Sequence, residues 1–209
     1  KLEERLEKAL AEELEQRRRQ EERARKEAER RRHAATDDTI KPSKVAESDS
    51  RQSVREDLSG TTVLKDSRRL SGSFESNKGK MPYPVDGEFT IVKKFGRQKH
   101  PRLPKVETNN PGIDIETVRG ATVHAVFNGE VSQIFKLAGY NNVIVLRHGD
   151  YVTVYANIAT LNVKKGDKVS IGQQLGRVFV DKADGNRSVL HFELRREKEK
   201  ENPELWLKR

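Results

Sequence analysis

The chain has 209 residues, of which 36% are charged and only 33% are apolar, and its formal net charge is +9 at neutral pH. This composition is too polar for a chain that is globular throughout. It contains no cysteine, which excludes stabilisation by disulfide bonds. No apolar run approaches the roughly 18 residues of a membrane-spanning helix. The basic charge by itself identifies no partner, and since no groove-reading or base-stacking element accompanies it, we expect no nucleic acid as a partner.

The apolar residues are distributed unevenly along the chain. Residues 1 to about 80 are charged or rich in Ser, whereas residues 81–209 carry most of the Val, Ile, Phe and Gly. We therefore predict three parts. They are a helix over residues 1–35, a linker with short helices over residues 36–80, and a β domain over residues 81–209.

The first part has a leucine stripe with a spacing of four residues, formed by Leu2, Leu6, Leu10 and Leu14. This spacing puts the leucines on one face of a helix. Acidic and basic residues also alternate at i and i+4, as in Glu15 with Arg19 and Glu22 with Lys26, and each such pair adds a few tenths of a kcal/mol. Two interpretations stay open: the remnant of a longer coiled coil, or a single solvated helix.

The second part has linker composition, interrupted by two short apolar pairs. Ser53 and Glu56 have the spacing of a capping box, which predicts one short helix. Leu70 and Phe74 form an i, i+4 pair that ends before Gly79. These faces are too small to be stable alone, so we expect them to dock onto another part of the protein.

The third part alternates apolar and polar residues with period two, which predicts β-strands. The alternating segments are residues 88–92, 122–126, 130–135, 142–147, 151–156, 174–180 and 189–194. Turn formers such as Asn128-Gly129 separate them, and no βαβ pattern competes. We predict a mainly β fold with an antiparallel, two-layered sheet, and an exposed loop over Gly96–Thr108 that Pro101 and Pro104 stiffen.

Three motifs lie in this β part: Asn110-Pro-Gly-Ile-Asp114, Tyr155-Ala-Asn157 and Ser188-Val-Leu-His191-Phe-Glu-Leu-Arg195. In order and spacing they resemble the signature of the LytM or lysostaphin-type zinc metallopeptidases, which is His-x-Gly-x-Asp, Tyr-x-His and His-x-His-Phe-Glu. The resemblance implies the duplicated hybrid motif fold of that family. It also implies that zinc ligands would stand at positions 110, 114 and 191, and catalytic histidines at positions 157 and 189.

The chain departs from this signature at the positions that carry the chemistry. Asn110 replaces a ligand, and Asn157 and Val189 replace both catalytic histidines, whereas Asp114 and His191 remain. Catalytic zinc needs three protein ligands and an open position for water, and proton transfer needs an imidazole or a comparable base. We therefore expect no catalytic residue, no bound metal and no cofactor, and a hydrogen bond between Asp114 and His191 across the former active site.

The other histidines offer one alternative, an active zinc endopeptidase that cleaves peptidoglycan cross-links and draws its missing ligand from His124 or His100. His124 lies on a predicted strand, where a partly buried side chain is expected. His100 lies in the predicted exposed loop. His148 follows a strand at a tight turn, so we predict it to be a surface residue.

A narrower resemblance rests on Leu70-Ser-Gly-Ser-Phe74, Asn77-Lys-Gly79 and Pro82-Tyr-Pro-Val85 ahead of the altered zinc site. These features resemble the murein hydrolase activators of the EnvC type. That resemblance implies a non-catalytic activator of cell-wall amidases in cell separation, in the periplasm or cell envelope, with the signal peptide removed. It further implies a division-associated membrane complex that binds the coiled coil, and an autoinhibitory element within residues 40–70.

In such an activator the former active site serves as a groove for the amidase. The candidate groove residues are Tyr140, Tyr155, Asn157, Val189, His191 and Arg195. Strand alternation predicts that His191, Glu193 and Arg195 share one face, while Phe192 and Leu194 face the core. Near the end of the chain, Trp206 is expected to pack against the domain. A third reading is a structural module that binds peptidoglycan through the basic surface.

Overall fold

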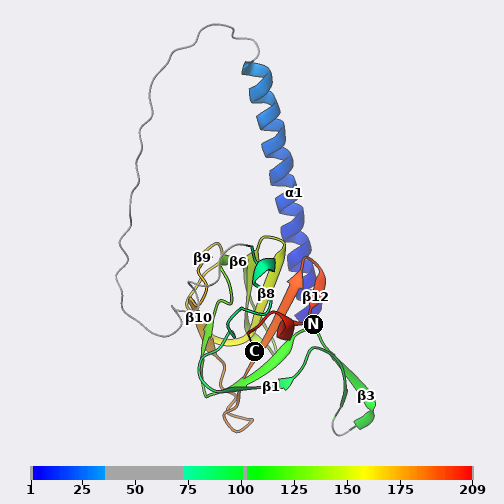
Figure 1. Ribbon diagram of the computed structural model, residues 1–209, viewed down its shortest axis with the longest axis vertical. Helices are drawn as coiled ribbons and strands as arrows, with labels where there is room; N and C mark the ends of the chain where they lie inside the picture. Colours follow the sequence, from blue (N-terminus) through cyan, green and yellow to red (C-terminus); the bar gives the residue numbers. More distant parts are fainter. Residues whose placement is uncertain (1, 36–72, 101–102, 209) are drawn as a thin grey trace, which may run out of the picture. The chain divides into compact units, whose positions relative to one another are not determined.

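The structure is a computed structural model that describes residues 2–35, 73–100 and 103–208 (Figure 1). The predicted short helix at Ser53, the apolar residue Leu70 and the predicted autoinhibitory element lie outside these residues. From Lys8 onward the helix belongs to a compact unit distinct from the one that contains the β domain.

Helix α1 runs from Leu2 to Ala35, as predicted. Glu15 bonds Arg19 at 2.5 Å, and Glu22 bonds Lys26 at 2.7 Å, so the pairs at i and i+4 form as the sequence indicates. Both pairs are well exposed, and each contributes only a few tenths of a kcal/mol. The coiled coil stays a prediction. None of the described helices is both long and apolar enough to cross a lipid bilayer.

The β domain is built on one large antiparallel sheet, which confirms the predicted fold class. Its main path follows the order β1 (Phe89–Lys93), β4 (Ile113–Thr117), β11 (Ser188–Arg196), β8 (Tyr151–Leu161), β7 (Asn141–His148), β6 (Gly129–Leu137) and β9 (Lys168–Val169). Strand β10 (Gln174–Val178) pairs with β8 and with β5 (Thr122–His124), and β12 (Glu199–Glu201) pairs with β11. Two short 3-10 helices complete the domain, η1 (Glu75–Asn77) and η2 (Pro203–Leu205).

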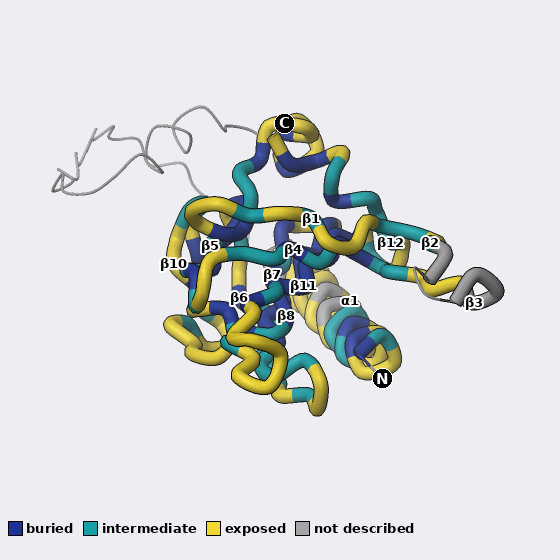
Figure 2. The backbone as a smooth tube through the Cα atoms, turned by 90° about the horizontal axis from the view of Figure 1, so that it is seen from below, coloured by how far each residue is buried: buried dark blue, intermediate teal, exposed yellow. Residues whose placement is uncertain are grey.

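Strands β2 (Gly96–His100) and β3 (Leu103–Asn110) pair only with each other and form a hairpin. Figures 1 and 2 show it extending away from the large sheet. The prediction of an exposed loop over Gly96–Thr108 is therefore wrong. Polar residues on both faces of these strands leave no apolar alternation to detect, and backbone pairing such as Gln98 with Thr108 makes the hairpin instead.

The core lies between the strands and includes Phe74, upstream of the predicted start of the domain at residue 81. The Phe74 ring stacks on His148 at 4.9 Å and on Tyr151 at 4.8 Å between centroids, and it also contacts Trp206. The expectation that Phe74 docks is thereby confirmed. Trp206 is buried as well, as predicted for the end of the chain.

His148 is buried and not a surface residue, contrary to the prediction, because Phe74 covers the turn in which it lies. Its Nδ1–H donates to the backbone oxygen of Asn128 at 2.7 Å, and its Nε2 lies 2.8 Å from the hydroxyl of Thr153. Burial lowers the pKa of His148 to about 4. A neutral ring therefore satisfies the polar groups of this part of the core.

Candidate functional site

Three neighbouring strands bring Lys93, Asp114 and His191 into one row. Lys93 at the end of β1 is the register partner of Asp114 in β4, and Asp114 is the register partner of His191 in β11. Directly opposed residues of antiparallel strands place their side chains on the same face, close enough to interact. The motif residues 114 and 191, which are 77 positions apart, meet because of this register.

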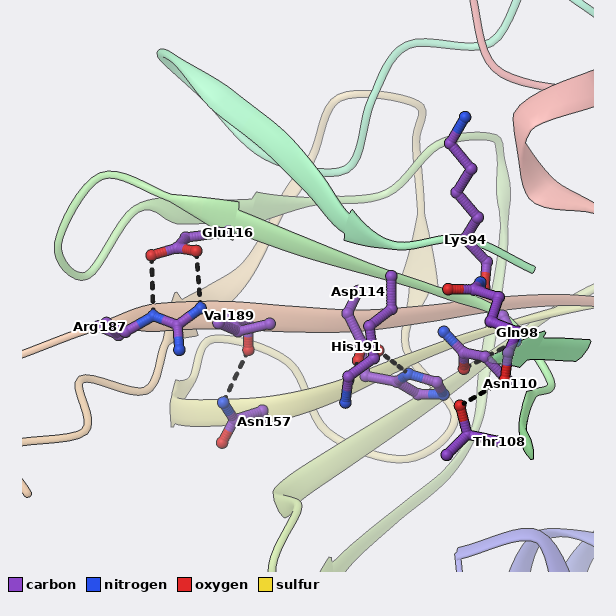
Figure 3. Close-up of polar contacts among 12 residues, drawn as sticks. Lys94, Gln98, Thr108, Asn110, Asp114, Glu116, Asn157, Arg187, Val189 and His191 are labelled. Atoms are coloured by element: carbon purple, nitrogen blue, oxygen red, sulfur yellow. Dashed lines mark hydrogen bonds and ion pairs between the residues drawn. The ribbon is translucent and has the colours of Figure 1, made fainter. Parts of the chain in front are cut away.

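The row continues along β11 as a chain of alternating charges (Figure 3 shows its Asp114–His191 part). His191 Nδ1 lies 2.6 Å from Asp114 Oδ1, and His191 Nε2 lies 3.1 Å from Glu193 Oε1. Arg195 donates to Glu193 Oε2 from Nε at 2.8 Å and from Nη2 at 2.6 Å. At the other end, Lys93 Nζ lies 3.3 Å from Asp114 Oδ2. The expected hydrogen bond between Asp114 and His191 is confirmed.

Burial and charge act in opposite directions on this row. Burial by itself lowers the pKa of His191, but the hydrogen bonds to Asp114 and Glu193 outweigh it and raise the pKa to about 9. Burial raises the pKa of Asp114 and of Glu193, yet His191, with Lys93 or Arg195, brings both below their ordinary values. His191 is therefore an imidazolium that donates from both nitrogens at neutral pH.

The two positions that match catalytic histidines are held by backbone geometry. Asn157 in β8 has φ of 72°, a left-handed conformation that Asn adopts more readily than most residues. Its Nδ2 donates to the Val189 backbone oxygen at 2.7 Å, and its Oδ1 accepts from Asn141 Nδ2 at 2.6 Å. Asn141 also has a positive φ, of 50°. The nitrogen and the oxygen of the Asn157 side-chain amide are therefore both hydrogen-bonded to neighbouring parts of the chain, and Figure 3 shows the bond to Val189.

Asn110 lies at the end of β3, where the hairpin joins the sheet (Figure 3). Its Oδ1 accepts the Gly112 backbone N–H at 3.4 Å, and its Nδ2 is buried without a hydrogen-bond partner. Gly112 is required next to it, because a Cβ there would lie 2.1 Å from the Phe192 backbone oxygen. The loop from Asn110 to Asp114 is thus pressed directly against β11.

These residues surround a cleft of about 820 Å³ between the hairpin and the large sheet. Four of the six residues expected in the groove line it: Tyr140, Asn157, Val189 and His191. The other two do not. Tyr155 is fully buried and accepts the Val126 N–H on its hydroxyl, and Arg195 is fully buried against Glu193.

The misplacement of these two residues has a simple reason. Tyr155 and Phe192 pack ring against ring in the core, at 5.3 Å between centroids. Strand alternation correctly puts His191, Glu193 and Arg195 on one face, as their shared hydrogen bonds confirm. That face is covered as well as the face toward the core. Every residue from Leu190 to Arg195 is therefore buried. Lys93, which sequence reasoning did not single out, lines the cleft instead.

As arranged, these residues do not fit a catalytic zinc ion. A ligating histidine needs one nitrogen lone pair for the metal, whereas both nitrogens of His191 face carboxylates. Asp114 divides its oxygens between His191 and Lys93, and Asn110 offers at best a neutral amide oxygen. Among the described residues no group of three His, Cys, Asp or Glu side chains could hold a metal ion.

Two other histidines whose side chains the structure describes, His124 and His148, stand apart from the cleft. His124 is partly buried on β5, as expected, with Nδ1 at 2.9 Å from the Gly172 oxygen and Nε2 at 2.6 Å from Asp86. The side chain of His100 lies outside the described residues. Neither His124 nor His148 lines the cleft.

Comparison with known proteins identifies related domains. Residues 108–203 match the model of peptidase family M23. The cell division protein DipM of Caulobacter vibrioides is 30% identical over 66% of this chain and 22% of its own length. The murein hydrolase activator NlpD of Salmonella dublin is 31% identical over 60% of this chain and 30% of its own length.

Solved structures agree with this assignment. A zinc-containing peptidase from Vibrio cholerae has 29% sequence identity and a TM-score of 0.51, over 59% of this chain and 39% of that chain. The similarity to the curated relatives spans only about a fifth to a third of their length. It therefore concerns the β domain of this chain.

Proposed function

We propose that this protein uses the cleft of the domain that matches peptidase family M23 to bind and activate a cell-wall amidase, without hydrolysing peptidoglycan itself. The observation that carries the proposal is the commitment of both His191 nitrogens to Asp114 and Glu193. A side chain held in this way neither ligates zinc nor accepts a proton at neutral pH.

The former catalytic positions support the same reading. Asn157 and Val189 bond each other and contain no group that could act as a general base. The similarity to a murein hydrolase activator and to a cell division protein favours a role in cell-wall remodelling during cell separation. On this proposal the protein works in the periplasm or cell envelope and is an activator of the EnvC type, and a division-associated membrane complex acts on the N-terminal helix.

The cleft has the properties of a peptide-binding groove. It combines the rings and apolar groups of Tyr140, Val189 and Val92 with polar groups from β1 and the hairpin. Val92 is 39% exposed there. Grooves of this kind bind a segment of a partner through apolar anchors and orient it through a few polar contacts.

Release of dye from labelled sacculi tests the proposal. The full chain is assayed alone, with zinc, and with the cell-wall amidase of the same organism. We expect release only when the amidase is present. Tyr140→Ala and Val92→Gln should reduce this activation at least about tenfold, since they remove anchors from the groove.

Val118→Gln is the matched control, because Val118 is also exposed, at 51%, but does not line the cleft. It should activate like the wild type. Zinc-dependent release by the protein alone would instead support the second candidate, a zinc endopeptidase. That candidate rests on the retention of Asp114 and His191 side by side and on the similarity to a zinc-containing peptidase.

A further inference from the structure

The cleft offers hydrogen-bond donors that the protein itself does not fully engage. Asn110 Nδ2 is buried without a partner, and the bond from Gly112 to Asn110 Oδ1 fixes which end of the amide is left over. Lys93 reaches Asp114 with only one of its three N–H donors. Burial, followed by the nearby carboxylates of Asp114 and Glu193, raises the pKa of Tyr140, so its hydroxyl keeps its proton.

Several acceptors that line the cleft, including the only carboxylate among its described lining residues, are already engaged. Both Asp114 oxygens face cations, and the carboxamide oxygen of Asn157 accepts from Asn141. The Val189 backbone oxygen accepts from Asn157. A buried donor without a partner is unfavourable, so the cleft is complementary to a ligand that carries acceptors, above all a carboxylate.

The hairpin beside the cleft is strongly basic. Residues 96–110, which span the hairpin, contain four Lys and Arg residues and one acidic residue, Glu107, and Lys93 and Lys94 directly precede them. Lys94 and Arg97 are exposed, and no ion pair joins either of them to another residue that the structure describes. Because hairpin residues Gln98 and Thr108 line the cleft, the basic hairpin borders the cleft directly.

We propose that the cleft and the β2–β3 hairpin together recognise an acidic segment of the amidase. One carboxylate of that segment enters the cleft and accepts from Lys93 and Asn110, and further acidic side chains lie along Lys94 and Arg97. This inference rests on the proposed function and specifies the chemistry of its partner. Charge complementarity of this kind accelerates association and excludes neutral or basic partners.

The composition of the cleft favours a protein segment over the carboxylates of the cell wall. Its lining includes the large or apolar side chains of Tyr140, Val92, Pro111 and Val189. The short stem peptides of peptidoglycan carry carboxylates but no large apolar side chains to fill such a surface. A protein segment supplies both kinds of group.

Affinity of the full chain for the cell-wall amidase of the same organism tests the hairpin. Lys94→Glu combined with Arg97→Glu should weaken binding at least about tenfold and remove most of the salt dependence between roughly 0.05 and 0.5 M NaCl. Lys164→Glu combined with Lys168→Glu changes the charge by the same amount at exposed residues that do not line the cleft. This control should stay within about twofold of the wild type.

A second pair of variants tests the carboxylate in the cleft. Asn110→Leu and Lys93→Met each remove a donor and should weaken binding about five- to tenfold, with an unchanged melting temperature as the check on folding. Replacing each acidic residue of the amidase in turn by its amide should identify one carboxylate whose loss is not additive with Lys93→Met.

The outcomes separate the two proposals. If the wild type does not bind the amidase at all, the proposed function fails. If it binds, but the hairpin variant matches its control and affinity is independent of salt, only the acidic segment is wrong. If the hairpin variant loses binding to purified sacculi while its affinity for the amidase is intact, the anionic partner is the cell wall, which also overturns this inference.

Discussion

Asn157 and Val189, which occupy the two positions of catalytic histidines in the LytM pattern, are joined by a hydrogen bond of 2.7 Å from the Asn157 side chain to the Val189 backbone oxygen. This bond has a structural role of its own. It connects β8 to β11 at the wall of the cleft, in a backbone conformation with φ of 72° that suits Asn and disfavours most other residues. Stability measurements can separate the contribution of this hydrogen bond from the contribution of the backbone conformation.

Asn157→Ala should destabilise the domain by about 2–3 kcal/mol, because it strains the left-handed backbone and leaves the Val189 oxygen and the Asn141 amide without partners. Asn157→Gly removes the strain and should cost roughly 1 kcal/mol less than Ala. Urea denaturation measures both. Asn186 also has a positive φ, of 62°, but it is exposed. Substituting Asn186 should therefore show only the difference in stability between Ala and Gly that backbone strain causes. An equal total cost at both positions would mean that the hydrogen bonds of Asn157 contribute nothing.

His191 should make the domain less stable at alkaline pH. Its folded pKa of about 9 lies above its ordinary value of 6.5, so its contribution is complete below pH 6.5 and is lost as the pH rises toward 9. The free energy of unfolding should fall in this window, by at most about 1.4 kcal/mol per pH unit. His191→Gln should flatten the curve, and NMR titration of Asp114→Asn should give a lower pKa for His191. An unshifted pKa in that variant would contradict the charge row.

His148 should have the opposite effect. Burial holds its pKa at about 4, so the unfolded chain takes up a proton first as the pH falls below 6.5. The free energy of unfolding should therefore fall as the pH is lowered from 6.5 to 4, and it should recover as the pH is raised again. His148→Gln should reduce the slope in denaturation curves across this window, whereas His124→Gln, at a less buried site, should retain it. A wild-type stability independent of pH from 6.5 to 4 would refute the buried neutral ring.

The buried pair of Glu193 and Arg195 should be far more sensitive than its exposed counterpart. Both side chains are fully buried, so Arg195→Met leaves Glu193 Oε2 without its partner and the carboxylate with His191 alone, and should cost about 3–5 kcal/mol. Arg187 forms a similar two-pronged pair with Glu116, at 2.9 and 2.7 Å, on the surface. Arg187→Met should cost far less, because solvent screens an exposed pair. Equal losses in thermal or urea unfolding would show that burial does not govern these pairs.

Apolar alternation predicted the large sheet well but failed where polar residues form strands. Strands β7, β8 and β11 were evident, because their residues face a packed core. The β2–β3 hairpin lacks such a face, and its two prolines indicated a loop. The short strand β4 was also missed, since its polar residues Asp114 and Glu116 alternate within a run of only five residues.

The site was likewise predicted in part and missed in part. The motifs correctly placed Asp114 next to His191, because register on neighbouring strands is fixed by the pattern of the whole sheet. They could not reveal that Arg195 is buried, since a charged residue enters the core only when a partner such as Glu193 compensates it. Lys93 could not be identified from the sequence for a similar reason, because only the pairing of β1 with β4 brings it next to Asp114.

Phe74 determines where an independent fragment of this protein can begin. Its ring lies among His148, Tyr151 and Trp206, and the chain that follows is held to the last described residues, where the Lys208 backbone N–H donates to the Met81 oxygen at 2.7 Å. A fragment cut at residue 108, where the family match starts, would expose three aromatic rings and lose β1 with Lys93. A fragment that begins at residue 73 keeps the aromatic cluster closed and the cleft complete, but it removes Leu2 and Leu6, which are buried and belong to the same compact unit.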